Sequence, residues 1–147
     1  WNSGTALSWE RSTQPLPAGV AMMLADLNRL QREHTALSEW DCDARGFEWL
    51  SGDDREQSVI SFVRRSSHES VAVVLNFTPV ARHGYRIPVA EEGVYHEIFN
   101  SDATRYGGSG VENQGALQTE AVPYHGRGHS LCVTLPPLGG VVLRYQS

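Results

Sequence analysis

The sequence has no lysine, and the absence of a basic cluster removes one class of partner. All 12 Lys+Arg positions are arginine, and they are scattered along the chain. Acidic residues number 17, which gives a formal net charge of -5. A protein that binds nucleic acid needs a basic stripe to neutralise phosphates. We therefore expect no nucleic-acid partner.

Long apolar runs and a leader sequence are also missing. No run approaches the ~20 apolar residues that a helix needs to span a bilayer. The first residues do not form a charged-then-apolar leader. From these patterns we expect no membrane association and a cytoplasmic location. The chain opens on Trp1 and not on methionine, which indicates a piece of a longer protein.

Cysteine is scarce, with only Cys42 and Cys132. Two cysteines are too few for a disulfide framework, and their spacing is not that of metal ligands. Free cysteine behaves as a small hydrophobic residue. We therefore expect two reduced, largely buried thiols.

Residue patterns that carry catalytic or metal chemistry are weak. A retaining glycosidase needs two carboxyl groups about 5–5.5 Å apart across one bond. The adjacent acids Asp53-Asp54 and Glu91-Glu92 fall in expected hairpin turns, where side chains diverge into solvent. His125 and His129 have the spacing of zinc ligands on a helix, but the glycines between them disfavour a helix. The sequence predicts no catalytic residue, no metal site and no cofactor.

One segment has helical periodicity. Apolar residues recur every three or four positions at Val20, Met23, Leu24, Leu27 and Leu30. This spacing predicts an amphipathic helix over residues 18–33.

From residue 40 onward, the period of the apolar residues becomes two. Alternation is clear over residues 71–77, 131–135 and 141–145, and shorter stretches lie at 60–62, 85–89 and 94–99. Pro88 cannot donate to a strand ladder, so it favours an edge strand. The pattern predicts a mainly β protein, an antiparallel β-sandwich of about seven to eight strands preceded by one α-helix.

A long loop is expected over residues 100–128, with a glycine cluster at 107–110. Loops longer than ~12–15 residues are usually functional or disordered. Flat side chains with polar tips suit a sugar ring, which has an apolar face and hydroxyl groups. The candidate glycan contacts are Tyr106, Tyr124, His125, Arg105 and Arg127. We expect the other large aromatic residues, Trp40, Phe47, Trp49, Phe62 and Phe77, to lie in the core.

Several short motifs occur in an order that is specific to one family. They are Trp1-Asn2, Leu7-Ser8-Trp9, Asp26-Leu27-Asn28, Gly46-Phe47-Glu48-Trp49-Leu50, Asn76-Phe77-Thr78-Pro79-Val80, Tyr106-Gly107-Gly108-Ser109 and His129-Ser130-Leu131. Together they resemble the C-terminal region of a bacterial 1,4-α-glucan (glycogen) branching enzyme of the α-amylase superfamily. The resemblance covers nearly the whole chain.

This resemblance implies a division of the chain and a role for it. Residues 1–38 would be the tail of a (β/α)8 barrel with one helix, and residues 39–147 an α-amylase-type C-terminal β-sandwich. The family's catalytic Asp and Glu belong to barrel loops upstream of Trp1, so the chain alone should be inactive. The implied role is that of a non-catalytic domain that supports the barrel of the same polypeptide in glycogen biosynthesis.

Two alternatives remain open. The chain could be a glycan-binding module that contacts α-glucan or glycogen through the 100–128 loop. It could also end another barrel glucan enzyme, such as a debranching enzyme or a trehalose-forming hydrolase. In either case the apolar face of the 18–33 helix needs a partner, so we expect the isolated chain to self-associate there, or residues 1–35 to be disordered.

Overall fold

The computed structural model describes residues 3–6 and 8–146, so Trp1-Asn2 and Leu7 of the family motifs lie outside the described residues. One long helix, α1 (Pro15–Glu33), precedes eight strands. The strands are β1 (Phe47–Asp54), β2 (Val59–Arg65), β3 (Ser70–Asn76), β4 (Arg82–Pro88), β5 (Val94–Asn100), β6 (Ala116–Gln118), β7 (Ser130–Leu135) and β8 (Gly139–Gln146). Short 3-10 turns are η1 (Trp9–Thr13), η2 (Thr35–Leu37), η3 (Ala44–Gly46) and η4 (Thr104–Tyr106).

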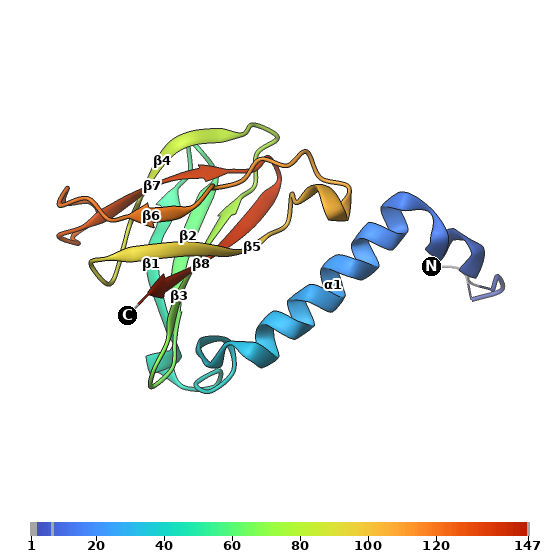
Figure 1. Ribbon diagram of the computed structural model, residues 1–147, viewed down its shortest axis with the longest axis horizontal. Helices are drawn as coiled ribbons and strands as arrows, with labels where there is room; N and C mark the ends of the chain where they lie inside the picture. The colour runs from blue at the N-terminus through green and yellow to red at the C-terminus, as the bar shows by residue number, and fades with distance from the viewer. Residues whose placement is uncertain (1–2, 7, 147) are drawn as a thin grey trace.

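The strands form two antiparallel sheets. One has six strands in the order β1-β2-β3-β8-β5-β6, and the other pairs β4 with β7. The sheets face each other, and α1 crosses below them and extends well past their edge (Figure 1). The predicted fold class, a mainly antiparallel β-sandwich preceded by one helix, is confirmed. Pro88 ends β4, whose single partner is β7, so its edge position is confirmed too.

The main core lies between the two sheets. Its residues alternate along the strands, since every second side chain points to the same face. They are Leu50, Val59, Val63, Ala72, Val74, Ile87, Val89, Tyr95, Leu131, Val133, Leu135, Val141 and Leu143.

A second apolar cluster joins α1 to the outer face of the six-stranded sheet. Leu30 is buried there, and Met23 and Leu27 pack beside it against strand residues that include Val71 and Phe99. The sequence pattern placed Val20 and Leu24 on the same face, but both remain exposed. Val20 lies on the part of α1 that extends beyond the sheet (Figure 1), whereas Leu24 stands between Met23 and Leu27, which pack on the sheet, and is turned to the side of that contact.

Several aromatic residues expected in the core lie on the surface instead. Trp49 and Phe77 are 56% and 58% exposed, and Phe47 is exposed as well. In β1, Leu50 points to the inner core, so Phe47 and Trp49 point outward, where α1 does not reach. Their rings cluster with the half-buried Phe62 at centroid distances of 5.1 to 5.9 Å.

The expectations for the cysteines and the acidic pairs also need correction. Cys42 is exposed and Cys132 is half-buried; neither forms a disulfide. Asp54 accepts a 2.6 Å hydrogen bond from Tyr85, and Glu91 lies 3.5 Å from Arg65 in an ion pair. Only Asp53 and Glu92, the other members of the two acidic pairs, are exposed to solvent as expected for a turn. The 100–128 segment, expected as one loop, contains η4 and β6.

Candidate functional site

The candidate residues Arg105 and Tyr106 lie where the sandwich meets α1. Tyr106 is only 6% exposed, and its ring packs 6.0 Å from that of Phe99. Its hydroxyl donates a 2.5 Å hydrogen bond to Asp26 on α1 and accepts one of 2.6 Å from Arg105. The hydrogen bond from Tyr106 is the main cause that lowers the pKa of the Asp26 carboxyl. Tyr106 therefore presents no open ring face to a sugar and instead fastens the helix.

The candidate residues Tyr124, His125 and Arg127 come together on one hairpin. Tyr124 and Arg127 exchange backbone hydrogen bonds of 3.0 Å, and the turn between them holds His125 and Gly126 at φ values of 44° and 77°. Two consecutive positive φ angles are typical of a two-residue hairpin turn. The rings of Tyr124 and His125 lie 4.4 Å apart at the tip.

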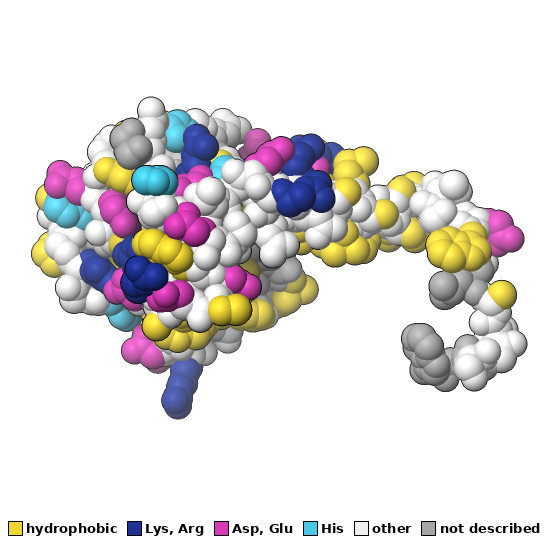
Figure 2. All heavy atoms as spheres, turned by 90° about the horizontal axis from the view of Figure 1, so that it is seen from below, with side chains coloured by type: hydrophobic (Ala, Val, Ile, Leu, Met, Phe, Trp, Pro, Cys, Tyr) yellow, Lys and Arg dark blue, Asp and Glu magenta, His cyan; other side chains and the backbone are white. Residues whose placement is uncertain are grey.

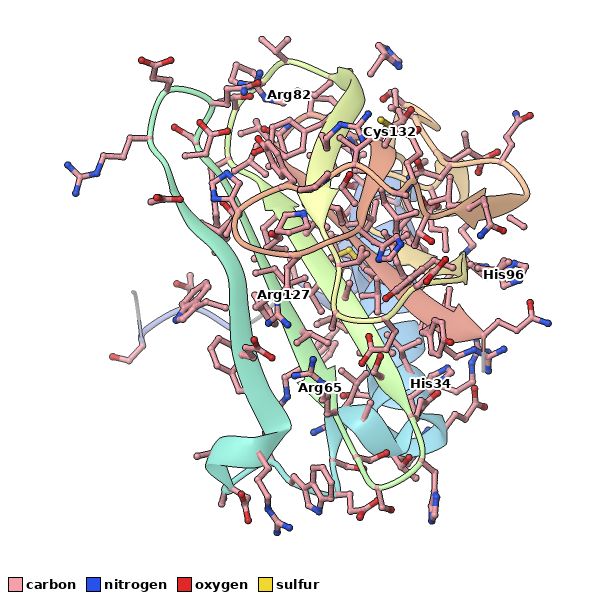
Figure 3. The ribbon with its side chains drawn as sticks, turned by 90° about the vertical axis from the view of Figure 1, so that its left-hand side faces the viewer. His34, Arg65, Arg82, His96, Arg127 and Cys132 are labelled. Carbon is pink, nitrogen blue, oxygen red and sulfur yellow. The ribbon has the colours of Figure 1, made fainter. Side chains whose placement is uncertain are left out.

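The base of this hairpin is held by a charged cluster. Arg127 and Arg65 both form ion pairs with Glu48 of β1, the second at 2.5 Å. Figure 3 shows the two arginines side by side between the strands. All three side chains are half-buried or partly exposed, so solvent screens part of this attraction. The cluster fixes where the Tyr124-His125 tip sits relative to β1.

A polar hollow of ≈ 400 Å³ lies at the end of the sandwich that receives the C-terminal end of α1. It is lined by Thr35, His68, Glu69, Arg144, Tyr145 and Gln146. These residues come from η2, from the turn between β2 and β3, and from β8. Sequence reasoning missed this hollow, because its residues are far apart in the chain and none belongs to a recognisable motif.

An apolar surface follows α1 and the outer face of the six-stranded sheet. On the helix, Leu16, Val20 and Leu24 are 68%, 52% and 54% exposed. Where the helix meets the sheet, an apolar groove of ≈ 260 Å³ is lined by residues that include Met23, Leu75 and Val142. Figure 2 shows hydrophobic side chains along the projecting helix and where it meets the sandwich. Exposed apolar surface of this extent is typical of an interaction site.

The described residues contain no group of three or more His, Cys, Asp or Glu that could hold a metal ion. Within the same residues, no helix has both the length and the apolar character needed to cross a membrane.

Comparison with known proteins defines the class. Residues 49–146 match the family model of the α-amylase C-terminal all-β domain. This match covers more than half of the chain, and the sheets described above are all-β as the family requires. The chain belongs to this family of domains.

Two curated relatives that the chain resembles are both 1,4-α-glucan branching enzymes. The chain is 51% identical over 146 residues to a 1,4-α-glucan branching enzyme (GlgB) of Rubrobacter xylanophilus, covering 98% of this chain and 20% of that protein. It is 50% identical over 143 residues to the enzyme of the same name from Methylococcus capsulatus, covering 97% of this chain and 19% of that protein. The chain thus spans about a fifth of the length of the curated relatives it matches.

The crystal structure of an α-amylase from H. orenii superposes with a TM-score of 0.45 at 18% identity, over 80% of this chain and 18% of that one.

Proposed function

We propose that the chain is the C-terminal, non-catalytic domain of a 1,4-α-glucan branching enzyme, and that its exposed apolar face supports the catalytic barrel of the same polypeptide. The parent protein would transfer α-1,4-glucan segments to form α-1,6 branches in glycogen biosynthesis. The identity to curated branching enzymes along nearly the whole chain supports the parent's activity.

The observation that carries the docking role is the exposed apolar surface of α1. Three large apolar side chains, Leu16, Val20 and Leu24, lie in solvent on a helix that projects beyond the sandwich. Fully burying one such side chain contributes roughly 1.5–3 kcal/mol. The division of the chain at residues 38/39, into a barrel tail and a sandwich, is part of this proposal.

Hydrogen exchange tests the docking role in the full-length parent. Amides of residues 15–25 should exchange slowly in the full-length protein and much faster in the 147-residue chain, because only the former covers the helix. Amides of β3, which is buried in the described chain, provide the internal control. Equal exchange of residues 15–25 in both proteins would overturn the docking role. The 147-residue chain should also form no α-1,6 branches on amylose.

A second candidate function is glucan contact by the hairpin tip. It rests on the paired rings of Tyr124 and His125, which stand at the end of a hairpin with Arg127 at its base. Such a pair can stack on a sugar ring while its polar atoms bind hydroxyl groups. Arg105 and Tyr106 do not join this site, because they are engaged with Asp26.

Native gels that contain glycogen test this second function. Glycogen should retard the chain, and Tyr124→Ala should remove the retardation. Phe77→Ala is the matched control, since Phe77 is an exposed aromatic residue outside the hairpin. Retardation that is equal in all three proteins would exclude the hairpin tip as the contact.

A further inference from the structure

The polar hollow beside η2 has a rigid wall. The Glu69 carboxylate lies 2.6 Å from Nδ1 of His34 and accepts a 3.2 Å hydrogen bond from the backbone N–H of Ala36. The hydroxyl of Ser66 accepts hydrogen bonds from the backbone N–H groups of His68 and Glu69, at 3.3 and 3.0 Å. These bonds fix the β2–β3 turn against the end of α1. The hollow therefore has a defined shape before any ligand arrives.

Three polar groups at the hollow keep their hydrogen-bonding capacity. Among the described residues, no hydrogen bond is formed by the guanidinium of Arg144, the imidazole of His68 or the hydroxyl of Tyr145, although the charge of Arg144 helps to lower the pKa of the Glu69 carboxyl. Arg144 and His68 are exposed, whereas the Tyr145 ring is half-buried and packs 5.4 Å from that of Tyr95. The other strand arginines, Arg64, Arg65, Arg82 and Arg86, each donate side-chain hydrogen bonds, which sets Arg144 apart from them within the described strands.

The mixture of donors and acceptors indicates a neutral, hydroxyl-rich ligand. Arg144 and Tyr145 can donate hydrogen bonds. The Glu69 carboxylate, which accepts from His34 and Ala36, and the Gln146 amide, whose Oε1 lies 2.7 Å from Nε2 of His96, keep further lone pairs that can accept them. Each sugar hydroxyl both donates and accepts. An anion, in contrast, would meet the carboxylate of Glu69 at short range and be repelled.

The hollow continues into a second one. This neighbour has a volume of ≈ 210 Å³, shares His68, Glu69 and Tyr145 with the first, and adds residues that include Ser70 and Glu91. The two hollows form an open track along the end of the sandwich, with Tyr145 common to both. Small-molecule sites are usually enclosed and mostly apolar. The first hollow is lined mainly by polar atoms and the second mainly by apolar ones. An open track of this mixed character suits a linear oligosaccharide that binds weakly along its length, because sugar rings carry both hydroxyl groups and apolar faces.

We propose that this track, centred on His68, Arg144 and Tyr145, binds a short α-1,4-glucan segment. The choice of an α-linked glucan rests on the proposed function, whereas the assignment of a neutral oligosaccharide rests on the track itself. The site is separate from the Tyr124-His125 hairpin tip.

Calorimetric titration of the 147-residue chain with maltoheptaose tests the site. Arg144→Gln keeps a polar side chain but shortens it and removes its charge, and it should raise the Kd by about fivefold. His68→Ala should raise the Kd in the same direction. Arg55→Gln is the matched control, because Arg55 is an exposed arginine in the β1–β2 turn, and it should bind as the unmodified chain does. Thermal unfolding of each variant confirms that it is folded.

Backbone amide chemical shifts locate the ligand independently of the variants. Maltoheptaose should shift amides of residues 66–70 and 144–146. Shifts confined to residues 124–127, or unchanged affinity in both Arg144→Gln and His68→Ala, would overturn the site. Displacement of the sugar by inorganic phosphate would identify an anion site instead and also overturn it. Cellohexaose, with β linkages, should bind more weakly, and equal binding would overturn the α-glucan assignment.

Failure of this proposal can be told from failure of the docking role. The docking role is measured by hydrogen exchange of residues 15–25, which are not part of the track. If maltoheptaose does not bind at the track while α1 stays protected in the full-length protein, only the glucan site is overturned. Retained maltoheptaose binding without that protection would overturn only the docking role.

Discussion

The hydroxyl of Tyr106 lies 2.5 Å from the carboxylate of Asp26, although 80 positions separate the two residues in the chain. This hydrogen bond fastens α1 to the sandwich near the point where the helix leaves the sheet. Arg105 binds both partners, and Arg29 of α1 also forms an ion pair with Asp26 at 2.8 Å, so the contact is a four-membered polar cluster.

Removing the Tyr106 hydroxyl should loosen the helix without unfolding the sandwich. Tyr106→Phe keeps the ring against Phe99 and leaves Asp26 without its phenolic donor. A lost hydrogen bond to a charged group should speed the exchange of α1 amides by about tenfold. Tyr85→Phe is the matched control, since Tyr85 donates to Asp54 at 2.6 Å away from the helix. Equal exchange in α1 for both variants would contradict the role of Tyr106.

Acid should release α1 before the sandwich unfolds. The hydrogen bond from Tyr106 lowers the pKa of Asp26 below its usual 3.8. Burial raises the pKa of Glu69, but hydrogen bonds from His34 and the Ala36 amide outweigh it, so this pKa falls below its usual 4.5. A carboxyl with a lower pKa in the folded state stabilises that state above its unfolded pKa. The contribution is therefore complete above pH 4.5 and is lost as the pH falls through the folded values.

Hydrogen exchange of residues 26–36 between pH 6 and pH 3, corrected for intrinsic rates, measures this release. The double variant Asp26→Asn, Glu69→Gln should show little pH dependence, because it lacks both carboxyl groups. A pH response as large as that of the unmodified chain would refute the assignment.

Gly19 should resist replacement by alanine even though it lies within a helix. In an exposed helix interior, Gly→Ala stabilises by about 1 kcal/mol. A Cβ atom at Gly19 would overlap the backbone carbonyl oxygen of Tyr106, so the helix and η4 would have to separate. We expect Gly19→Ala to destabilise the chain by about 1–3 kcal/mol. Urea denaturation measures the change, with Asn28→Ala at an exposed position of the same helix as the control.

Without a barrel, the exposed face of α1 should drive self-association of the chain. Sedimentation velocity at increasing concentration should show a growing dimer fraction. Leu24→Glu places a charge on the apolar surface and should leave the chain monomeric. Ala25→Glu adds the same charge at the neighbouring exposed position, which turns away from the sheet, and should leave association unchanged. A monomer at every concentration, with a well-protected helix, would contradict this prediction.

The inner core should be far more sensitive than the surface to the loss of apolar atoms. Leu131 is fully buried between the sheets, and Leu131→Ala should cost about 2–5 kcal/mol. Leu138, exposed in the β7–β8 turn, provides the same chemical change, and Leu138→Ala should stay within about 0.5 kcal/mol. Comparable losses for the two variants in thermal unfolding would mean that the core is misassigned.

Local patterns in the sequence predicted the elements well, because alternation and helical spacing record which side chains face a core. The strands around Val74, Leu131 and Leu143 follow directly from period-two alternation. The pattern could not tell which apolar faces stay uncovered in this chain. Val20 and Leu24 fit the helical face, yet the sheet beneath α1 ends before Val20, and Leu24 is turned to the side of the contact made by Met23 and Leu27.

Features that depend on distant parts of the chain were beyond the sequence pattern. The sequence placed Tyr106 in a loop, because nothing near it indicates that Asp26 will accept a hydrogen bond from its hydroxyl. The polar hollow unites Thr35, His68 and Arg144 from three separate elements, so no local motif could reveal it. The hairpin tip was easier to predict from the sequence, because Tyr124 and Arg127 are only three positions apart.

The six-stranded sheet cannot be completed before β8 has been synthesised. This strand is made after the other seven, yet it lies between β3 and β5 in the six-stranded sheet. Until the ribosome has passed Gln146, the β1-β2-β3 and β5-β6 groups each have an unpaired edge where β8 belongs. Open strand edges recruit other chains. A nascent or truncated chain that lacks residues 139–146 is therefore the form most exposed to aggregation, and a chaperone that shields those two edges would protect it.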